Sequence, residues 1–275
     1  LLLRAGLIDQ GQYLALLAKS IQALAINPGA QLQSVAQASF DAWVKYYRPD
    51  ENTLNATVSY YTKGALLALC LDLTLRSEGQ GNLDALMRLL WRQQKGNIIV
   101  FFEADIAAAL AQVGQRSFAP ELQAWVHGTG DLPLQALLQQ QGIAWQTQTP
   151  TWAQRLGIKV QEGKSASASS LKIQAVLRGS CAEAAGLAAG DEWLGLELAG
   201  QTWRLYQLDQ LAYLLPPAVQ DGLQAVGILY SREQRIHQGR LRLTDCPAPL
   251  QALRVQDAAQ AGDWLRAEPP SPTGL

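Results

Sequence analysis

Hydrophobic positions recur every three to four residues through residues 1–145, with short polar breaks between the periodic segments. This spacing predicts a series of amphipathic helices joined by short connections. Two of them begin at capping boxes, one formed by Asp9 and Gln12 and the other by Ser34 and Gln37. The second of these helices is expected to carry the apolar residues Phe40, Trp43, Val44 and Tyr47.

The segment Val58–Arg76 differs from its neighbours because it is nearly all apolar from Gly64 onward. A helix that is apolar on most faces is surrounded by other helices inside a domain. The segment is too short to span a bilayer and is interrupted by Asp72. We therefore expect it to be the central helix of an all-α unit.

The first turn of this central helix combines unusual residue types: Tyr60, Tyr61, Lys63 and Gly64. A phenol at the end of a buried helix can donate a hydrogen bond into a cleft while packing holds its ring. Consecutive residues point about 100° apart on a helix, so only one tyrosine can face such a cleft. The alternative is that the tyrosines only plug the helix end. Lys63 could orient a substrate or a neighbouring carboxylate, or be a surface lysine.

Four further helices are predicted between the central helix and residue 145. Asn82 caps the first, whose buried stripe is Leu83, Leu86, Leu90 and Trp91. The other three are expected over residues 103–113, from Ser117 to His127, and from Pro133 to Gly142.

From residue 152 the period changes from helical to alternating, which predicts a small β domain over residues 152–246. Strands are expected at 156–160, 171–176, 193–198, 225–230 and 240–244, with a loop at 163–170, a helix at 206–214 and a hairpin around Glu233. Residues 247–275 are expected to form a C-terminal tail, with a strand signal at 250–255 and a short helix containing Ala261 and Trp264.

Composition excludes several classes of function. The chain has 275 residues, a net charge of −1 and only 16% charged residues, so it lacks the basic surface that nucleic acid or anionic lipid requires. Cys70, Cys181 and Cys246 are odd in number and far apart, which suits a reducing compartment, and we expect a cytoplasmic protein. No phosphate-binding loop or Ser/His/Asp arrangement stands out. Core packing is expected for the tryptophans: Trp43, Trp91, Trp125, Trp145, Trp152, Trp193, Trp203 and Trp264.

Three sequence blocks resemble known families. Tyr61-Thr62-Lys63-Gly64, followed by Ala65–Leu69, resembles the Tyr-x-Lys-Gly helix of gluzincin aminopeptidases, and its flanks resemble the glycyl aminopeptidase family. His127–Pro133 resembles a Gly-Thr-x-x-Leu-Pro turn of that family. Gly179–Leu194 resembles the Gly-Ser-x-Ala-x-x-Ala-Gly-Leu-x-x-Gly-Asp block of bacterial-type PDZ domains. The resemblance implies a multidomain α-plus-β protein: the helical part of a thermolysin-like catalytic domain followed by a PDZ-like β-barrel.

The resemblance implies that Tyr61 donates to the oxyanion formed when water adds to the scissile carbonyl. The family binds zinc through two histidines at helical spacing with a glutamate between them. This chain has only His127 and His237, neither in such a motif. It also begins at Leu1 in the middle of an apolar pattern, so we expect an inactive fragment without metal ligands. Zinc and the missing N-terminal catalytic part would belong to the full-length enzyme, which would act on peptides with small N-terminal residues.

The second expected site is the groove of the PDZ-like domain. A peptide would add as a strand beside the one that starts at Ile158, and backbone N–H groups of Leu156, Gly157 and Ile158 would receive its C-terminal carboxylate. Alternatively the groove holds a segment of the same chain, such as residues 250–255, or docks on the catalytic domain. A non-catalytic, peptide-binding adaptor is the rival interpretation of the whole chain.

Overall fold

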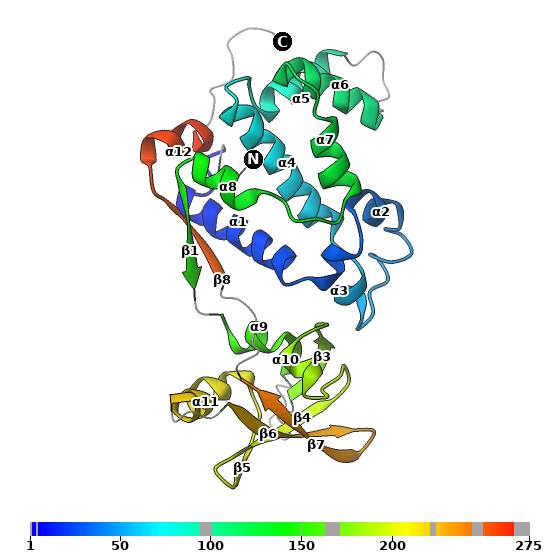
Figure 1. The fold of residues 1–275 in the computed structure, drawn as a ribbon, viewed down its shortest axis with the longest axis vertical. Helices are drawn as coiled ribbons and strands as arrows, with labels where there is room; N and C mark the ends of the chain where they lie inside the picture. Colours follow the sequence, from blue (N-terminus) through cyan, green and yellow to red (C-terminus); the bar gives the residue numbers. More distant parts are fainter. Residues whose placement is uncertain are drawn as a thin grey trace.

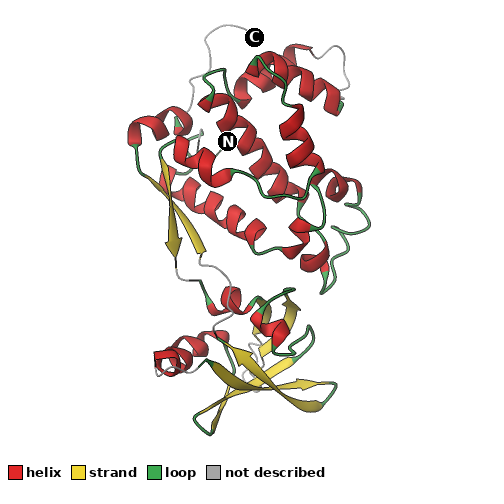
Figure 2. Ribbon diagram, in the orientation of Figure 1, coloured by secondary structure: helices red, strands yellow, loops and turns green. Residues whose placement is uncertain are grey.

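The computed structural model describes residues 2–3, 5–93, 101–148, 150–162, 171–220, 224–243 and 250–266. Figure 1 shows a helical unit and, below it, a smaller unit built around a sheet. Figure 2 shows that strands are concentrated in the smaller unit, apart from one two-stranded ribbon beside the helices. None of the helices in the described ranges is long and apolar enough to cross a membrane.

The helical unit follows the predicted order closely. Its elements are α1 (Gln10–Ala25), η1 (Pro28–Gln31), α2 (Val35–Phe40), α3 (Thr53–Ala56), α4 (Tyr60–Ser77), α5 (Leu83–Gln93), α6 (Glu103–Gly114), α7 (Ala119–Leu122), the π-helical turn η2 (Gln123–His127) and α8 (Leu134–Gln140). Both predicted capping boxes are present, at Asp9 with Gln12 and at Ser34 with Gln37. Asn82 also accepts from the backbone N–H of Ala85, as expected for a cap.

Helix α4 is the centre of this unit, as the apolar run predicted. One of its faces, with Leu66 and Leu73, packs into a cluster that includes residues of α1 and α8. Another face, with Leu71 and Leu75, packs into a second cluster with residues of α5, α6 and α7. The helix is therefore enclosed along most of its length, whereas Tyr61 in its first turn is 58% exposed.

The segment after α2 corrects one prediction. The helix ends at Phe40, and residues 41–47 form successive turns instead of continuing it. Phe40, Trp43 and Val44 are 90%, 81% and 70% exposed, so the expected apolar stripe faces solvent. Aromatic and β-branched residues favour helix only weakly, and Pro49 disfavours helical backbone at the residue before it. Trp91 and Trp203 are also exposed, so core packing was the wrong expectation for three tryptophans.

A two-stranded ribbon returns the chain to the helical unit. Strand β1 (Ile143–Gln148) pairs antiparallel with β8 (Leu250–Val255), and α12 (Ala258–Leu265) follows. Leu253 and Trp264 are buried in the same cluster as residues of α1. The segment expected as a tail therefore completes the helical core from residue 250 to 265. Because β8 pairs with β1, this segment does not occupy the groove of the smaller unit.

The smaller unit contains α9 (Trp152–Leu156), β2 (Ile158–Glu162), β3 (Leu171–Val176), α10 (Cys181–Ala184), β4 (Glu192–Leu198), β5 (Gln201–Arg204), η3 (Leu208–Gln210), α11 (Leu211–Gln220), β6 (Ala225–Arg232) and β7 (Arg235–Arg242). The strand order is β2-β3-β4-β6-β7, with β5 also paired to β4. In the described part of the chain this is an open sheet with β2 and β7 at its edges, where a closed barrel was expected. The predicted hairpin is present, since Glu233 and Gln234 take the positive φ values of a tight turn between β6 and β7. The predicted loop at 163–170 lies outside the described residues, as does Cys246.

Candidate functional site

The first turn of α4 places Tyr61 at the surface of the helical unit. Ser59 caps the helix by accepting from the backbone N–H of Thr62 at 3.2 Å. Tyr61 is 58% exposed, and its ring stacks on that of Tyr60 with centroids 4.3 Å apart. An added Cβ at Gly64 would meet nothing within 4 Å, so this side of the turn is also open. The phenol is thus held by a neighbouring ring while remaining accessible.

A third tyrosine joins the two on the helix. The hydroxyl of Tyr47 lies 3.0 Å from that of Tyr60 and 3.1 Å from that of Tyr61. Tyr46 packs its ring against Tyr60, with centroids 5.3 Å apart, and its hydroxyl accepts from Ser59 at 3.4 Å. The sequence interpretation missed Tyr46 and Tyr47. The available signal was an adjacent tyrosine pair just before the loop that leads into the first turn of α4.

The hydroxyl network shifts the pKa values of Tyr60 and Tyr61 in opposite directions. Hydrogen bonds from Tyr47 and then Tyr60 lower the pKa of Tyr61, whereas the bonds to Tyr47 and Tyr61 raise the pKa of Tyr60. A lowered pKa is the signature of an oxygen that accepts hydrogen bonds, because these bonds stabilise the phenolate. Either hydroxyl of the Tyr47–Tyr61 pair can be the donor, and when Tyr61 accepts, its own proton is free to be donated elsewhere.

Lys63 faces away from this surface. Its side chain is 2% exposed, and Nζ donates to the backbone carbonyl of Ala30 at 3.3 Å. Burial lowers its pKa, and the nearby charge of Asp131 partly opposes that effect. The surface-lysine alternative is therefore wrong. The side chain instead links the start of α4 to η1, and Asp131 is the neighbouring carboxylate.

A cavity of about 600 Å³ lies between the helical and sheet units. Lys63 and Asp131 line it from the helical unit, and Gly157 and Ser180 line it from the sheet unit. The contact beside it is polar: the side-chain amide of buried Asn55 donates to the carbonyl of Val176 at 2.9 Å and accepts from the N–H of Arg178 at 2.8 Å. Tyr61 is not among the residues that line this cavity, so the two features are separate.

The predicted peptide-binding turn has a structural role in the sheet unit. Leu156 and Ile158 are buried in the core of that unit. Gly157 ends α9 with a φ of 68°, and an added Cβ would lie 2.4 Å from the Cβ of Ser180, so only glycine fits. Its N–H donates to Gln154 at 3.2 Å and its carbonyl accepts from Leu177 at 2.8 Å. The adjoining strand β2 is an edge strand, and peptide binding there stays a prediction.

Neither histidine lies in a metal site. His127 places Nε2 2.7 Å from the Glu103 carboxylate near the surface, and His237 stacks on Tyr230 with centroids 5.4 Å apart. Within the described ranges there is no group of three or more His, Cys, Asp or Glu side chains that could hold a metal. These residues therefore do not fit a catalytic zinc ion.

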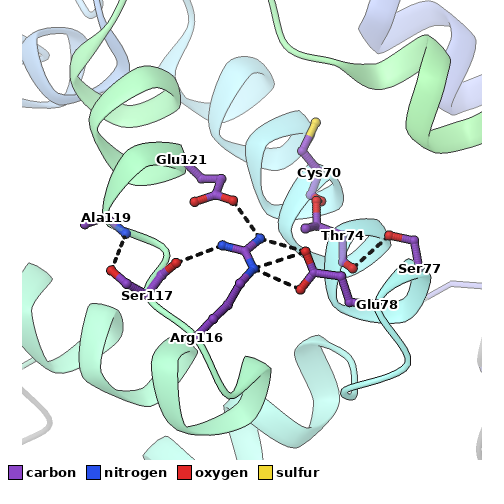
Figure 3. Close-up of polar contacts among 8 residues, drawn as sticks. All are labelled: Cys70, Thr74, Ser77, Glu78, Arg116, Ser117, Ala119 and Glu121. Atoms are coloured by element: carbon purple, nitrogen blue, oxygen red, sulfur yellow. Dashed lines mark hydrogen bonds and ion pairs between the residues drawn. The ribbon is translucent and has the colours of Figure 1, made fainter.

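The opposite end of α4 is held by an ion-pair cluster (Figure 3). The Arg116 guanidinium donates to Glu78 at 2.8 to 3.1 Å, to the carboxylate of Glu121 at 2.6 Å and to the carbonyl of Ser117 at 2.8 Å. The cluster connects the C-terminal end of α4 to the segment before α7 and to α7 itself. With all of these acceptors bound to one arginine, the arrangement is structural.

Comparisons with known proteins support the resemblance found in the sequence. Residues 1–67 match the family model described as M61 glycyl aminopeptidase, a range that includes Tyr61-Thr62-Lys63-Gly64. The resemblance to that family is therefore confirmed over this range. A search of curated proteins finds no match.

The whole fold is similar to a crystal structure of an aminopeptidase N family protein from Idiomarina loihiensis. The TM-score is 0.80 at 26% sequence identity, and the alignment covers 96% of this chain and 46% of that chain. The chain therefore spans just under half the length of the solved structure. Together the two findings relate this chain to peptidases.

Proposed function

We propose that this chain is the C-terminal part of a zinc-dependent aminopeptidase that removes small, glycyl-type N-terminal residues, with Tyr61 as its oxyanion donor. The observation that carries the proposal is an accessible phenol whose hydroxyl lies within hydrogen-bond distance of the Tyr47 hydroxyl and whose pKa is lowered by its phenol neighbours. It lies on the helix of the Tyr-x-Lys-Gly sequence, inside the range that matches the M61 family model.

The chemical role of Tyr61 follows from its surroundings. Its hydroxyl can give its single proton to a developing oxyanion, while its oxygen can accept from the Tyr47 hydroxyl. The stacked ring of Tyr60 restricts the orientation of the phenol before substrate arrives. A donor that is oriented in advance stabilises the transition state without reorganisation during the reaction.

Zinc would activate the attacking water and polarise the carbonyl. The described residues offer no ligand set for it, so its ligands and the general base are proposed to lie in the rest of the enzyme. The exposed apolar side chains of Phe40, Trp43 and Val44 support this arrangement, because they lie in the segment that carries Tyr47. We propose that the rest of the catalytic domain covers them. The solved aminopeptidase N family structure, of which this chain covers 46%, is long enough to contain such a part.

The sheet unit is proposed to be a PDZ-like domain that receives an extended peptide. Edge strand β2 is paired only with β3 in the described part of the sheet, so its other edge can accept an added strand. This observation also favours the second candidate function, a non-catalytic peptide-binding adaptor. The adaptor requires that the full-length protein lack a His-Glu-x-x-His sequence and hydrolyse no peptide.

The test is Tyr61→Phe in the full-length enzyme, assayed with glycyl and alanyl substrates. Loss of one oxyanion donor should lower kcat by about 10²- to 10³-fold with little change in KM. The matched control is Tyr213→Phe, which removes an equally exposed phenol hydroxyl from α11 in the sheet unit. Turnover that is unchanged by Tyr61→Phe would contradict the catalytic role. A wild-type protein with no peptidase activity that binds C-terminal peptides would favour the adaptor.

A further inference from the structure

We propose that Tyr47 is a positioning residue for Tyr61: its hydroxyl bridges Tyr60 and Tyr61 and directs the proton of Tyr61 outward, toward the substrate. This inference rests on the proposed function of Tyr61. The hydroxyl-to-hydroxyl distances of 3.0 Å and 3.1 Å are both within hydrogen-bond range. Tyr47 lies outside the Tyr-x-Lys-Gly sequence and comes from a different element, the turns after α2.

The distances allow the proton order that the positioning role needs. Either hydroxyl of each pair can donate, and Tyr47 can give its single proton to Tyr61 while accepting from Tyr60. The lowered pKa of Tyr61 and the raised pKa of Tyr60 have the directions that this arrangement produces. The proposed order is Tyr60 to Tyr47 to Tyr61. In a chain of hydrogen bonds each bond polarises the next, which makes the terminal hydroxyl a stronger donor.

The turns at residues 41–47 hold Tyr47 in place. Its backbone N–H donates to the carbonyl of Ala42 at 3.0 Å, and its ring lies 5.2 Å from that of Trp43. Lys45 and Asp41 form an ion pair across the same turns at 2.6 Å. A continuous helix through this segment would have required a different backbone at Tyr47. The break in the predicted helix is therefore what brings Tyr47 over the first turn of α4.

The first measurement is turnover by the full-length enzyme carrying Tyr47→Phe, which keeps the ring and removes the bridging oxygen. Losing a single hydrogen bond to the donor should lower kcat about 3- to 10-fold with KM nearly unchanged. The matched control is Tyr213→Phe. Its hydroxyl is exposed on α11 in the sheet unit, away from the tyrosine cluster, so kcat should stay at the wild-type value.

The second measurement needs no catalysis: an NMR titration of the Tyr61 phenol in the 275-residue chain. Tyr46, Tyr47 and Tyr60 are the titratable groups in ring or hydroxyl contact with it. Because the bond from Tyr47 lowers the pKa of Tyr61, Tyr47→Phe should raise that pKa, and Tyr46→Phe should not.

The outcomes separate this inference from the proposed function. If Tyr61→Phe leaves turnover unchanged, the proposed function of Tyr61 fails whatever Tyr47→Phe does. If Tyr61→Phe abolishes turnover while Tyr47→Phe changes neither kcat nor the Tyr61 pKa, the bridge is overturned. A shifted pKa with unchanged kcat would overturn the positioning role, because the bridge would then exist without affecting the donor.

Discussion

The two ends of α4 use polar side chains in opposite ways. At the first turn, phenols bond to one another at the surface, and Tyr61 keeps an accessible hydroxyl. Near the last turns, Asp72 is buried and its carboxylate accepts from Arg76 at 2.8 Å and from the backbone N–H of Leu83 at 2.7 Å. One end keeps a phenol hydroxyl exposed to solvent, whereas the carboxylate at the other end is bound by groups of the chain itself. Substitutions at the first end should therefore alter chemistry, and those at the second should alter stability.

The largest difference between the buried part of α4 and its first turn should be in the reactivity of a thiol placed at each. Cys70 is fully buried in α4, and burial raises the pKa of its thiol to about 12. Alkylation requires both exposure and the thiolate, so Cys70 should react only through unfolding, at least about 10³-fold more slowly than an exposed thiol. The comparison is Tyr61→Cys, measured at pH 8 by site-resolved mass spectrometry. Similar rates at the two positions would show that α4 opens readily.

The buried thiol of Cys70 should also make the free energy of unfolding depend on pH. Below about pH 9 the thiol is protonated in both folded and unfolded chains, so it contributes no pH dependence. Between about pH 9 and 12 the unfolded chain releases this proton and the folded chain does not, so its contribution lowers the free energy of unfolding as pH rises.

Removal of the buried carboxylate should have the next largest effect. Asp72→Ala removes the acceptor of the Leu83 N–H and one acceptor of the Arg76 guanidinium, and should lower the free energy of unfolding by about 2–3 kcal/mol. Asp72→Asn keeps an acceptor oxygen and should lose less. Urea denaturation measures both, with exposed Glu51→Ala as control. An Asp72→Ala variant as stable as the control would show that the contacts of Asp72 with Arg76 and Leu83 do not stabilise the fold.

The Arg116 cluster should contribute least, because its side chains are about one-third exposed, apart from Glu121. Arg116→Met should lower the free energy of unfolding by about 1 kcal/mol, and 1 M salt should reduce the difference. Arg48→Met is the control, since Arg48 is exposed in a loop. A loss well above this value would indicate that the buried oxygen of Glu121, which has no hydrogen-bond partner, depends on Arg116.

Local signals predicted most of the helical unit. The capping boxes at Asp9 and Ser34 and the apolar run of α4 depend on residues a few positions apart, and the structure contains all three. The pairing of β1 with β8 could not be predicted in the same way. It joins Ile143 to Val255 across the whole sheet unit, and either strand alone reads as a short apolar segment.

The sequence predicted only the part of the candidate site that depends on residues close together in the chain. Tyr61 could be selected because its motif is contiguous in the sequence. Tyr47 could not, because its bond to Tyr61 depends on turns that replaced an expected helix. The sequence left two alternatives open for Lys63 and could not choose between them, because sequence periodicity does not show that η1 supplies a buried carbonyl for this side chain.

The β1–β8 ribbon has a consequence for the modular history of the chain. Gln148 and Leu250 are paired partners, so the entry and exit of the intervening hundred or so residues lie about 5 Å apart. A short reverse turn could connect them directly. The sheet unit is thus an insertion whose two connections lie at one end of the ribbon. A relative could gain, exchange or lose this unit while the helical unit kept its fold.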